Sequence, residues 1–186
     1  MKRTISILLC SFLAIALCVF FSACANKTDD VEVTLTASWE HAYSGFEELY
    51  DSADAVAMIK VISHEQKEEI EGSTSLLMTY YDVEVNDIIK GTIPKRIVIP
   101  MTGGVSNGKT IQISDDPLMQ DGESYIVFVD LNPRGTYTVL GGPQGRYIVE
   151  GGKVYSLDKR YEAVQPAKGL LVDGTEYDTF KSGLKK

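Results

Sequence analysis

The sequence predicts a mainly β domain, a small antiparallel barrel or sandwich with one short helix before it and one after it. Stretches in which apolar side chains alternate with period two recur through the middle of the chain, and turn residues separate them. Helical spacing of apolar residues is present only on the two flanks of this region. About five or six strands at such short spacing are typical of a barrel or a sandwich, and strand periodicity alone does not choose between them.

The most hydrophobic predicted strand is 125–131, which contains no Gly or Pro and is expected at the centre of the sheet. Because strand side chains alternate, Tyr125, Val127 and Val129 should face the core, and Phe128 should be less central. A second strand, 55–62, is apolar on both faces and should be covered on both. The remaining predicted strands are 77–86, 96–101, 111–113 and 136–140.

Turn chemistry is clearest in a predicted hairpin over 147–156. Gly151-Gly152 tolerates the positive φ angles of a two-residue hairpin turn. The resulting register sets Glu150 opposite Lys153 as an exposed ion pair. Elsewhere the charged segment 64–72 and the segment 102–109, rich in Gly, Ser and Asn, are predicted as loops.

Two helices are expected on the flanks of the strands. Ser44 and Glu47 have the spacing of a capping box, so the first helix should begin near Ser44. Thr175 and Asp178 suggest the start of a second, capped helix near the C-terminus. The predicted apolar faces are Phe46, Leu49 and Tyr50 in the first helix, and Tyr177, Phe180 and Leu184 in the second.

The first residues have the pattern of an export signal. Lys2 and Arg3 give a positive start, 5–21 carries no charge, and the small residues Ser22 and Ala23 follow. The alternative is an uncleaved transmembrane anchor, because the apolar run approaches the ~20 residues that span a bilayer. A spanning helix has no need for small residues followed by a cysteine, which favours cleavage.

Residues 21–24 resemble the lipobox that the bacterial lipoprotein signal peptidase reads, although leucine is commoner where Phe21 stands. The resemblance implies that Cys24 is acylated, with palmitate among its lipids, and becomes the first residue. It also implies a lipoprotein held on the outer, extracytoplasmic face of the plasma membrane. We therefore expect a signal peptide over 1–23, a lipidated N-terminus and tether over 24–42, and a single domain over 43–186 that ends in a helix. A short strand is possible at 31–35.

The cysteines and the net charge limit which bonds and which partners are expected of the exported chain. Cys10 and Cys18 leave with the signal, so Cys24 is the only remaining thiol, and neither a disulfide nor a cysteine metal site is expected. The signal holds two of the 18 basic residues and none of the 26 acidic ones, so the mature chain is more acidic than the net −8 of the whole. Such a surface is repelled by phosphates, which argues against nucleic acid and against charge-driven membrane binding.

Residues 46–56, 81–91 and 121–128 together resemble bacterial proteins related to the netrin-like domain, the OB-type barrel also found in tissue inhibitors of metalloproteinases. Residues 141–147 are similar to a stretch that recurs in Gram-positive lipoproteins of this kind. The resemblance implies a small OB-like antiparallel barrel. In the inhibitors an amino-terminal cysteine binds the target's zinc, and here that cysteine would be acylated, so the inhibitory chemistry is carried over to no residue.

No constellation of catalytic or metal-ligating residues is evident in the sequence. His41 and His64 each lack a second histidine or a cysteine at ligand spacing, and are expected to be solvated. An acidic cluster could suggest calcium, but aspartate beside Pro or Gly is ordinary turn chemistry. We therefore expect no enzyme, no metal and no cofactor. The acidic cluster consists of Asp115, Asp116, Asp121 and Glu123.

Tyrosines on the predicted strands offer a possible binding face. OB barrels often bind ligands through aromatic side chains on an open sheet face. Tyrosine also has high strand propensity, so packing is the alternative role. The candidate face consists of Tyr80, Tyr125, Tyr137, Tyr147 and Tyr155.

The function expected from these patterns is a membrane-anchored, non-enzymatic binding or interaction domain at the cell envelope. Its partner would be an envelope protein or glycan, besides the membrane that holds the lipid on Cys24. The alternative is a protease inhibitor that acts through a projecting loop such as 102–109. An open face with several exposed tyrosines would favour binding, and a long rigid loop would favour inhibition.

Overall fold

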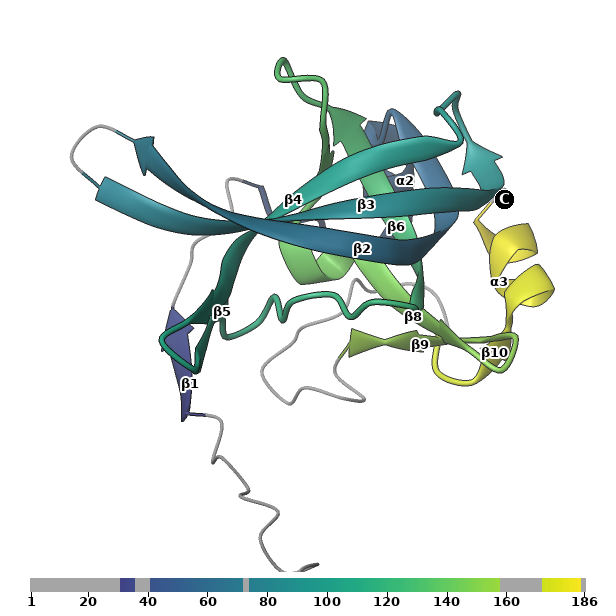
Figure 1. Cartoon of the computed structure of the whole chain (residues 1–186). Helices are drawn as coiled ribbons and strands as arrows, with labels where there is room; N and C mark the ends of the chain where they lie inside the picture. The colour runs from purple at the N-terminus through teal and green to yellow at the C-terminus, as the bar shows by residue number, and fades with distance from the viewer. Residues whose placement is uncertain (1–30, 36–40, 72–73, 158–171, 185–186) are drawn as a thin grey trace, which may run out of the picture. The chain divides into compact units, whose positions relative to one another are not determined.

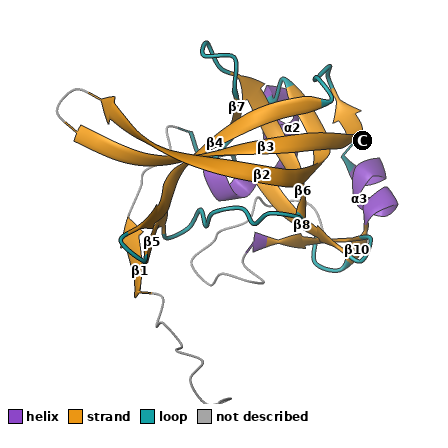
Figure 2. Cartoon of the chain, viewed as in Figure 1, coloured by secondary structure: helices purple, strands orange, loops and turns teal. Residues whose placement is uncertain are grey.

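The computed structural model describes residues 31–35, 41–71, 74–157 and 172–184. These residues are mainly β, as the sequence predicts (Figures 1 and 2). Ten strands form one sheet in the order β1-β5-β4-β3-β2-β6-β8-β9-β10, with β7 paired to β6. The strands are β1 Val31–Leu35, β2 Ala55–Glu71, β3 Thr74–Lys90, β4 Arg96–Ser106, β5 Lys109–Ile113, β6 Ser124–Leu131, β7 Tyr137–Val139, β8 Arg146–Glu150, β9 Lys153–Ser156 and β10 Thr175–Glu176. The helices are α2 Phe46–Ser52, the 3₁₀ turn η1 Gly142–Gly145 and α3 Tyr177–Gly183.

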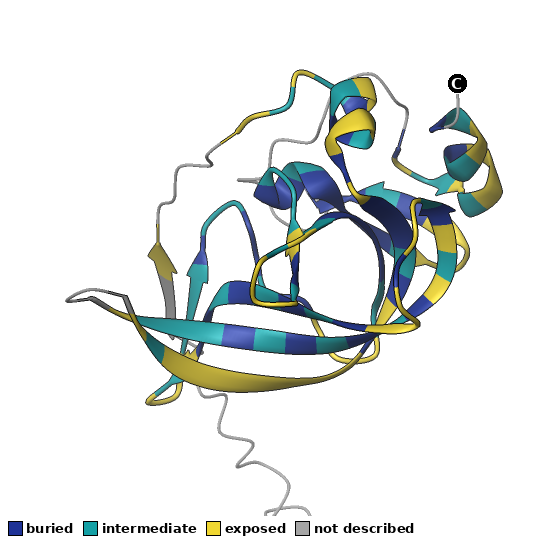
Figure 3. Ribbon diagram, turned by 90° about the horizontal axis from the view of Figure 1, so that it is seen from above, coloured by how far each residue is buried: buried dark blue, intermediate teal, exposed yellow. Residues whose placement is uncertain are grey.

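The sheet curls around an inner core (Figure 3), but its first and last strands do not pair with each other. The sheet is therefore not the closed barrel that the resemblance implies. All neighbouring strands are antiparallel except β1 and β5, which pair in parallel. The possible strand at 31–35 is therefore present and belongs to the sheet. Because β1 precedes α2, the first predicted helix is not the first element of the described chain.

Two layers of apolar side chains hold the fold together. The inner core lies within the curl of the sheet and includes Ile59, Val83, Ile99 and Val127. The outer core lies between the opposite face of β2, β6 and β8 and the helices α2 and α3. It is formed by Phe46, Leu49, Ala53, Val56, Ile89, Ile126, Phe128, Tyr147, Val154, Val172, Phe180 and Leu184.

Strand β6 lies between β2 and β8 and is buried on both faces, as predicted. Tyr125, Val127 and Val129 belong to the inner core, which confirms their predicted orientation. The expectation that Phe128 is less central is wrong. Phe128 is fully buried in the outer core, where its ring lies 6.1 Å from that of Phe46, because α2 covers the face to which it points.

The structure contains two α-helices, α2 and α3, and their buried residues belong to the predicted apolar faces. The predicted caps differ. Glu48 takes the place expected for Glu47: its carboxylate accepts the Ser44 backbone N–H at 2.8 Å and the Ser44 hydroxyl at 2.6 Å. Gly45 and Glu176 occupy the two N-cap positions.

The C-terminal helix is fastened to β3 by polar contacts. Asp87 accepts hydrogen bonds from Lys181 Nζ at 2.5 Å and from the Tyr177 hydroxyl at 2.8 Å. The bond from Lys181 is the main reason that the pKa of Asp87 is lowered. Helix α3 is thus held by an ion pair on β3 as well as by its apolar face.

The first predicted loop, 64–72, is wrong, because β2 continues to Glu71 and pairs with β3 to the end of the hairpin. We call residues 63–71 of β2 and 74–82 of β3 the arm. Its outer part, beyond Met78, where β3 no longer pairs with β4, is two-stranded and projects from the sheet (Figure 1). The segment was predicted as a loop because it is rich in charged residues, but both faces of an exposed ribbon can carry polar side chains. Lys67 lies opposite Met78, and Glu65 lies opposite Tyr80.

The second predicted loop, 102–109, is also wrong. β4 continues to Ser106, and a turn at Asn107-Gly108 leads directly into β5. Both turn residues have positive φ, 52° and 71°, which is the geometry that Asn-Gly favours in a two-residue hairpin. Gly103 allows close approach of the two strands, since a Cβ there would lie 2.3 Å from the Ile111 carbonyl oxygen.

The predicted hairpin at Gly151-Gly152 is confirmed in its register, with Glu150 opposite Lys153. The ion pair of Lys153 is made elsewhere, with Glu176 of β10 at 3.6 Å. Strand β10 runs beside β9 and places this carboxylate across from the lysine.

Candidate functional site

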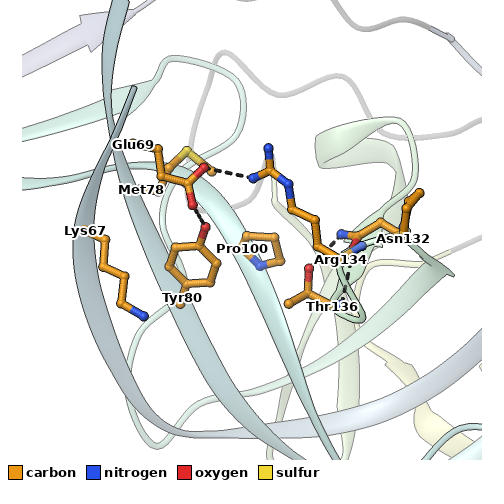
Figure 4. A pocket seen from close by; sticks show the side chains of 9 residues that line it. Lys67, Glu69, Met78, Tyr80, Pro100, Asn132, Arg134 and Thr136 are labelled. Atoms are coloured by element: carbon orange, nitrogen blue, oxygen red, sulfur yellow. Dashed lines mark hydrogen bonds and ion pairs between the residues drawn. The ribbon is translucent and has the colours of Figure 1, made fainter. Parts of the chain in front are cut away.

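A hollow of about 480 Å³ lies on the outer face of β3 and β4, beside the arm (Figure 4). We call it the seam hollow. Its floor is largely apolar and its rim carries charged and polar side chains. It is lined by Lys67, Glu69, Met78, Tyr80, Pro100, Asn132, Pro133, Arg134 and Thr136.

Strand alternation explains which side chains reach the hollow. Tyr81 of β3 and Ile99 of β4 point into the inner core, so their neighbours Tyr80 and Pro100 point outward. The arm supplies Lys67 and Glu69 on the same face. The turn between β6 and β7 supplies the opposite wall, because the curl of the sheet brings β7 close to β4.

The hollow lies at the unclosed edge of the sheet. Residues 96–102 of β4 pair with β3, and no ladder joins them to β7 among the described strands. Pro100 lies within this stretch and has no N–H, so its nitrogen cannot donate to a neighbouring strand. The seam between β4 and β7 therefore remains unpaired at the position of the hollow.

An ion pair spans the seam hollow from the arm to the β6–β7 turn. Arg134 Nη1 lies 2.9 Å from Glu69 Oε2, and the Tyr80 hydroxyl donates to the other oxygen of the same carboxylate. Lys67 Nζ lies 5.1 Å from the centre of the Tyr80 ring and 2.5 Å from Glu65 Oε1. Figure 4 shows Tyr80 between Lys67 on one side and Pro100 and Arg134 on the other.

The turn that carries Arg134 is stabilised by hydrogen bonds of the Asn132 side chain. Its side-chain oxygen accepts the backbone N–H groups of Arg134 at 3.0 Å and of Thr136 at 3.2 Å. Its amide nitrogen donates to the hydroxyls of Thr136 at 2.7 Å and of Thr138 at 3.2 Å. Four hydrogen bonds of one side chain therefore stabilise the turn that carries Arg134.

A smaller hollow of about 190 Å³ adjoins the first and shares Tyr80 with it. Its other lining residues include His64, Asp82 and Val98. His64 Nδ1 pairs with Asp121 at 2.8 Å, and its ring lies 5.7 Å from that of Tyr81. The two hollows together form a track along the outer face of β3.

The five tyrosines of the predicted binding face do not form one exposed face. Tyr80 lines the seam hollow, as the prediction requires. Tyr125 and Tyr137 are buried in the inner core and Tyr147 in the outer core, while Tyr155 packs against the inner core. The prediction grouped all tyrosines on strands together. Alternate positions of a strand face opposite sides of the sheet, so each tyrosine lies in the inner core, in the outer core or on the surface according to its position.

A buried ion pair at one end of the inner core was not foreseen. Arg146 is 1% exposed, and its Nη2 lies 2.8 Å from Asp116 Oδ1 and also donates to the Pro117 carbonyl. Its guanidinium carbon lies 5.6 Å from the centre of the Tyr125 ring. Burial raises the pKa of Asp116, and the adjacent guanidinium opposes that rise. The alternation of side chains along β8 could have predicted this burial, because Arg146 lies on the same strand face as Ile148 of the inner core.

The acidic cluster considered for calcium is dispersed among other partners. Asp116 pairs with Arg146, Asp121 pairs with His64, and Glu123 accepts the Tyr125 hydroxyl. His41, the other histidine, pairs with Glu48 at 3.0 Å. Within the described part of the chain, no group of three or more His, Cys, Asp or Glu side chains is placed to hold a metal ion.

No model of a known protein family matches the chain, and no curated protein shows significant similarity to it. Among the described residues, no helix is both long and apolar enough to cross a bilayer. The predicted signal at 1–23 and the acylated Cys24 lie outside the described residues. The site must therefore be interpreted from its own chemistry, which offers fixed donors, acceptors and an apolar floor.

Proposed function

We propose that this chain is a membrane-anchored, extracytoplasmic lipoprotein whose OB-like domain binds a ligand in the seam hollow without catalysis. The observation that carries the proposal is the hollow itself. It combines an apolar floor with a Glu69–Arg134 ion pair on the rim. Ligand sites typically have such a composition, largely apolar with a few placed polar groups.

The position of the hollow also fits an OB-type domain. In OB folds, ligands lie over strands 2 and 3 between the loops that join strands 1–2 and 4–5. If β2 is strand 1 and β5 is an extension of the β4 hairpin, the hollow lies over strands 2 and 3. The arm and the β6–β7 turn then take the places of the two loops.

The contacts of the hollow support binding rather than chemistry. Each charged group of the hollow is in an ion pair: Arg134 with Glu69 across the rim, and Lys67 with Glu65 on the same strand. In the adjoining hollow, His64 is paired with Asp121. An inhibitor acting through 102–109 lacks its projecting loop, because that segment is a tight hairpin. The lipobox-like residues 21–24 supply the argument for the anchor.

Photo-crosslinking on intact cells tests this function. A photoreactive amino acid at position 67, on the rim, is expected to capture an envelope component. The same amino acid at Lys153 is the matched control, since the side chains of Lys67 and Lys153 are 54% and 46% exposed and each pairs with one glutamate. Capture at position 67 should disappear when Tyr80→Ala is added. Equal capture at both positions, or none at position 67, would contradict the proposal.

A further inference from the structure

The seam hollow combines balanced charge, an apolar floor and paired planar polar groups, and this combination identifies a class of ligand. We propose that the hollow and its smaller neighbour bind a neutral oligosaccharide. This inference rests on the proposed binding function and names the chemistry of its ligand.

The charges around the hollow are already balanced. Arg134 is paired with Glu69, and Lys67 is paired with Glu65. In a chain of net charge −8, the site is thus neither a basic patch for anions nor an acidic patch for cations. A strongly charged ligand would have to break these pairs, whereas an uncharged ligand can bind beside them.

The pair on the rim matches the hydrogen-bonding capacity of sugar hydroxyls. A hydroxyl both donates and accepts, a carboxylate only accepts and a guanidinium only donates. Glu69 accepts from Tyr80 and Arg134 but retains further lone pairs, and Arg134 uses one of its several N–H groups in this pair. Two adjacent hydroxyls can therefore donate to Glu69 and accept from Arg134 without disturbing the ion pair.

The floor of the hollow matches the other surface of a sugar ring. Met78, Pro100 and Pro133 present apolar atoms around Tyr80. Tyrosine has an apolar ring and a polar tip, so it suits ligands that are apolar on one side and wet on the other. The C–H groups of a pyranose can rest on this floor while its hydroxyls reach the rim.

The adjoining hollow extends the site beyond a single sugar unit. It shares Tyr80 with the seam hollow and continues along β3 to Asp82 and Val98. A chain of linked sugars can follow this track, with Tyr80 at the junction between two units.

An extended peptide is less well matched to the same place. Peptides that bind as an added strand need unpaired N–H and C=O groups at a sheet edge. The edge of β4 beside the hollow contains Pro100, which has no N–H to donate. The free edge of the arm is lined by Glu65, Lys67, Glu68 and Glu69, the kind of charged edge that discourages strand addition.

Calorimetric titration of the purified full-length chain tests the inference, with maltotetraose, cellotetraose and chitotetraose as probes. At least one probe is expected to bind, and the affinity should be insensitive to added salt. Arg134→Gln and Tyr80→Ala should each weaken binding roughly tenfold or more, since each removes a directional or stacking contact. Lys153→Gln, which removes an ion-paired surface cation away from the hollow, should leave the affinity unchanged. Arg134 is 74% exposed on its side chain, so its variant should keep the thermal midpoint of the wild type.

The outcomes separate this inference from the proposed function. If no tetrasaccharide binds while photo-crosslinking at position 67 captures a protein, the oligosaccharide inference is wrong, and the proposal that the seam hollow is a binding site is retained. If no tetrasaccharide binds and position 67 captures nothing, both fail. Binding that Arg134→Gln and Tyr80→Ala leave unchanged would place the sugar elsewhere and overturn the inference.

Discussion

Val83→Asp is expected to unfold the domain. Val83 is fully buried in the inner core, and its neighbours across the two adjacent strands are Val61 and Ile97. A carboxylate at this position would have apolar side chains on both sides. A buried charge without a partner costs several kcal/mol, which is comparable with the whole stability of a domain, ~5–15 kcal/mol.

Thermal and urea unfolding of the purified variant would measure this effect. Asn86→Asp, on the same strand but at an exposed position, is the matched control and should stay close to the wild type. The inner core described above would be contradicted if Val83→Asp unfolded cooperatively within a few degrees of the wild type.

Asp116→Ala is the second substitution with a large expected effect. It removes the carboxylate that pairs with Arg146 and leaves a guanidinium that is 1% exposed. Arg146 Nε already has no hydrogen-bond partner among the described residues, so little compensation is at hand. Breaking a buried pair from one side typically costs about 3–5 kcal/mol.

A double variant separates the buried charge from the packing at this site. Asp116→Leu combined with Arg146→Met removes both charges and keeps apolar volume, a change that is often neutral or stabilising. We expect its free energy of unfolding to exceed that of Asp116→Ala. If urea unfolding instead gave the single variant the stability of the wild type, the pair would not be buried as described.

The elements that the sequence predicted well are those whose signal is local. Strand β6 follows from the apolar run at 125–129, and the β8–β9 hairpin follows from the positive φ of Gly151-Gly152. The arm was not predicted, because the charged residues of an exposed two-stranded ribbon give the same sequence pattern as a polar loop. Phe128 was misplaced because its burial depends on α2, a helix that covers the strand from far away in the sequence.

The candidate site could be predicted only in part, for a related reason. Tyr80 was named from its strand, but its partners Glu69 and Arg134 lie 65 residues apart from each other. They meet because the sheet curls until the β6–β7 turn reaches the arm, and the alternation pattern of single strands does not encode that curvature. Strand alternation in the hairpin predicts that the side chain of Arg146 faces the core, but a charged residue in a strand is ordinarily assigned to the surface.

We propose a binding domain held outside the membrane by the lipid on Cys24, and metabolic labelling with palmitate tests this anchor most directly. Cells expressing the wild type should yield a labelled band in the membrane fraction. Cys24→Ser should abolish the label, because serine offers no thiol for acylation. Cys18→Ser, which changes a cysteine in the predicted signal, should keep it. A wild-type chain that takes up no label would contradict the account.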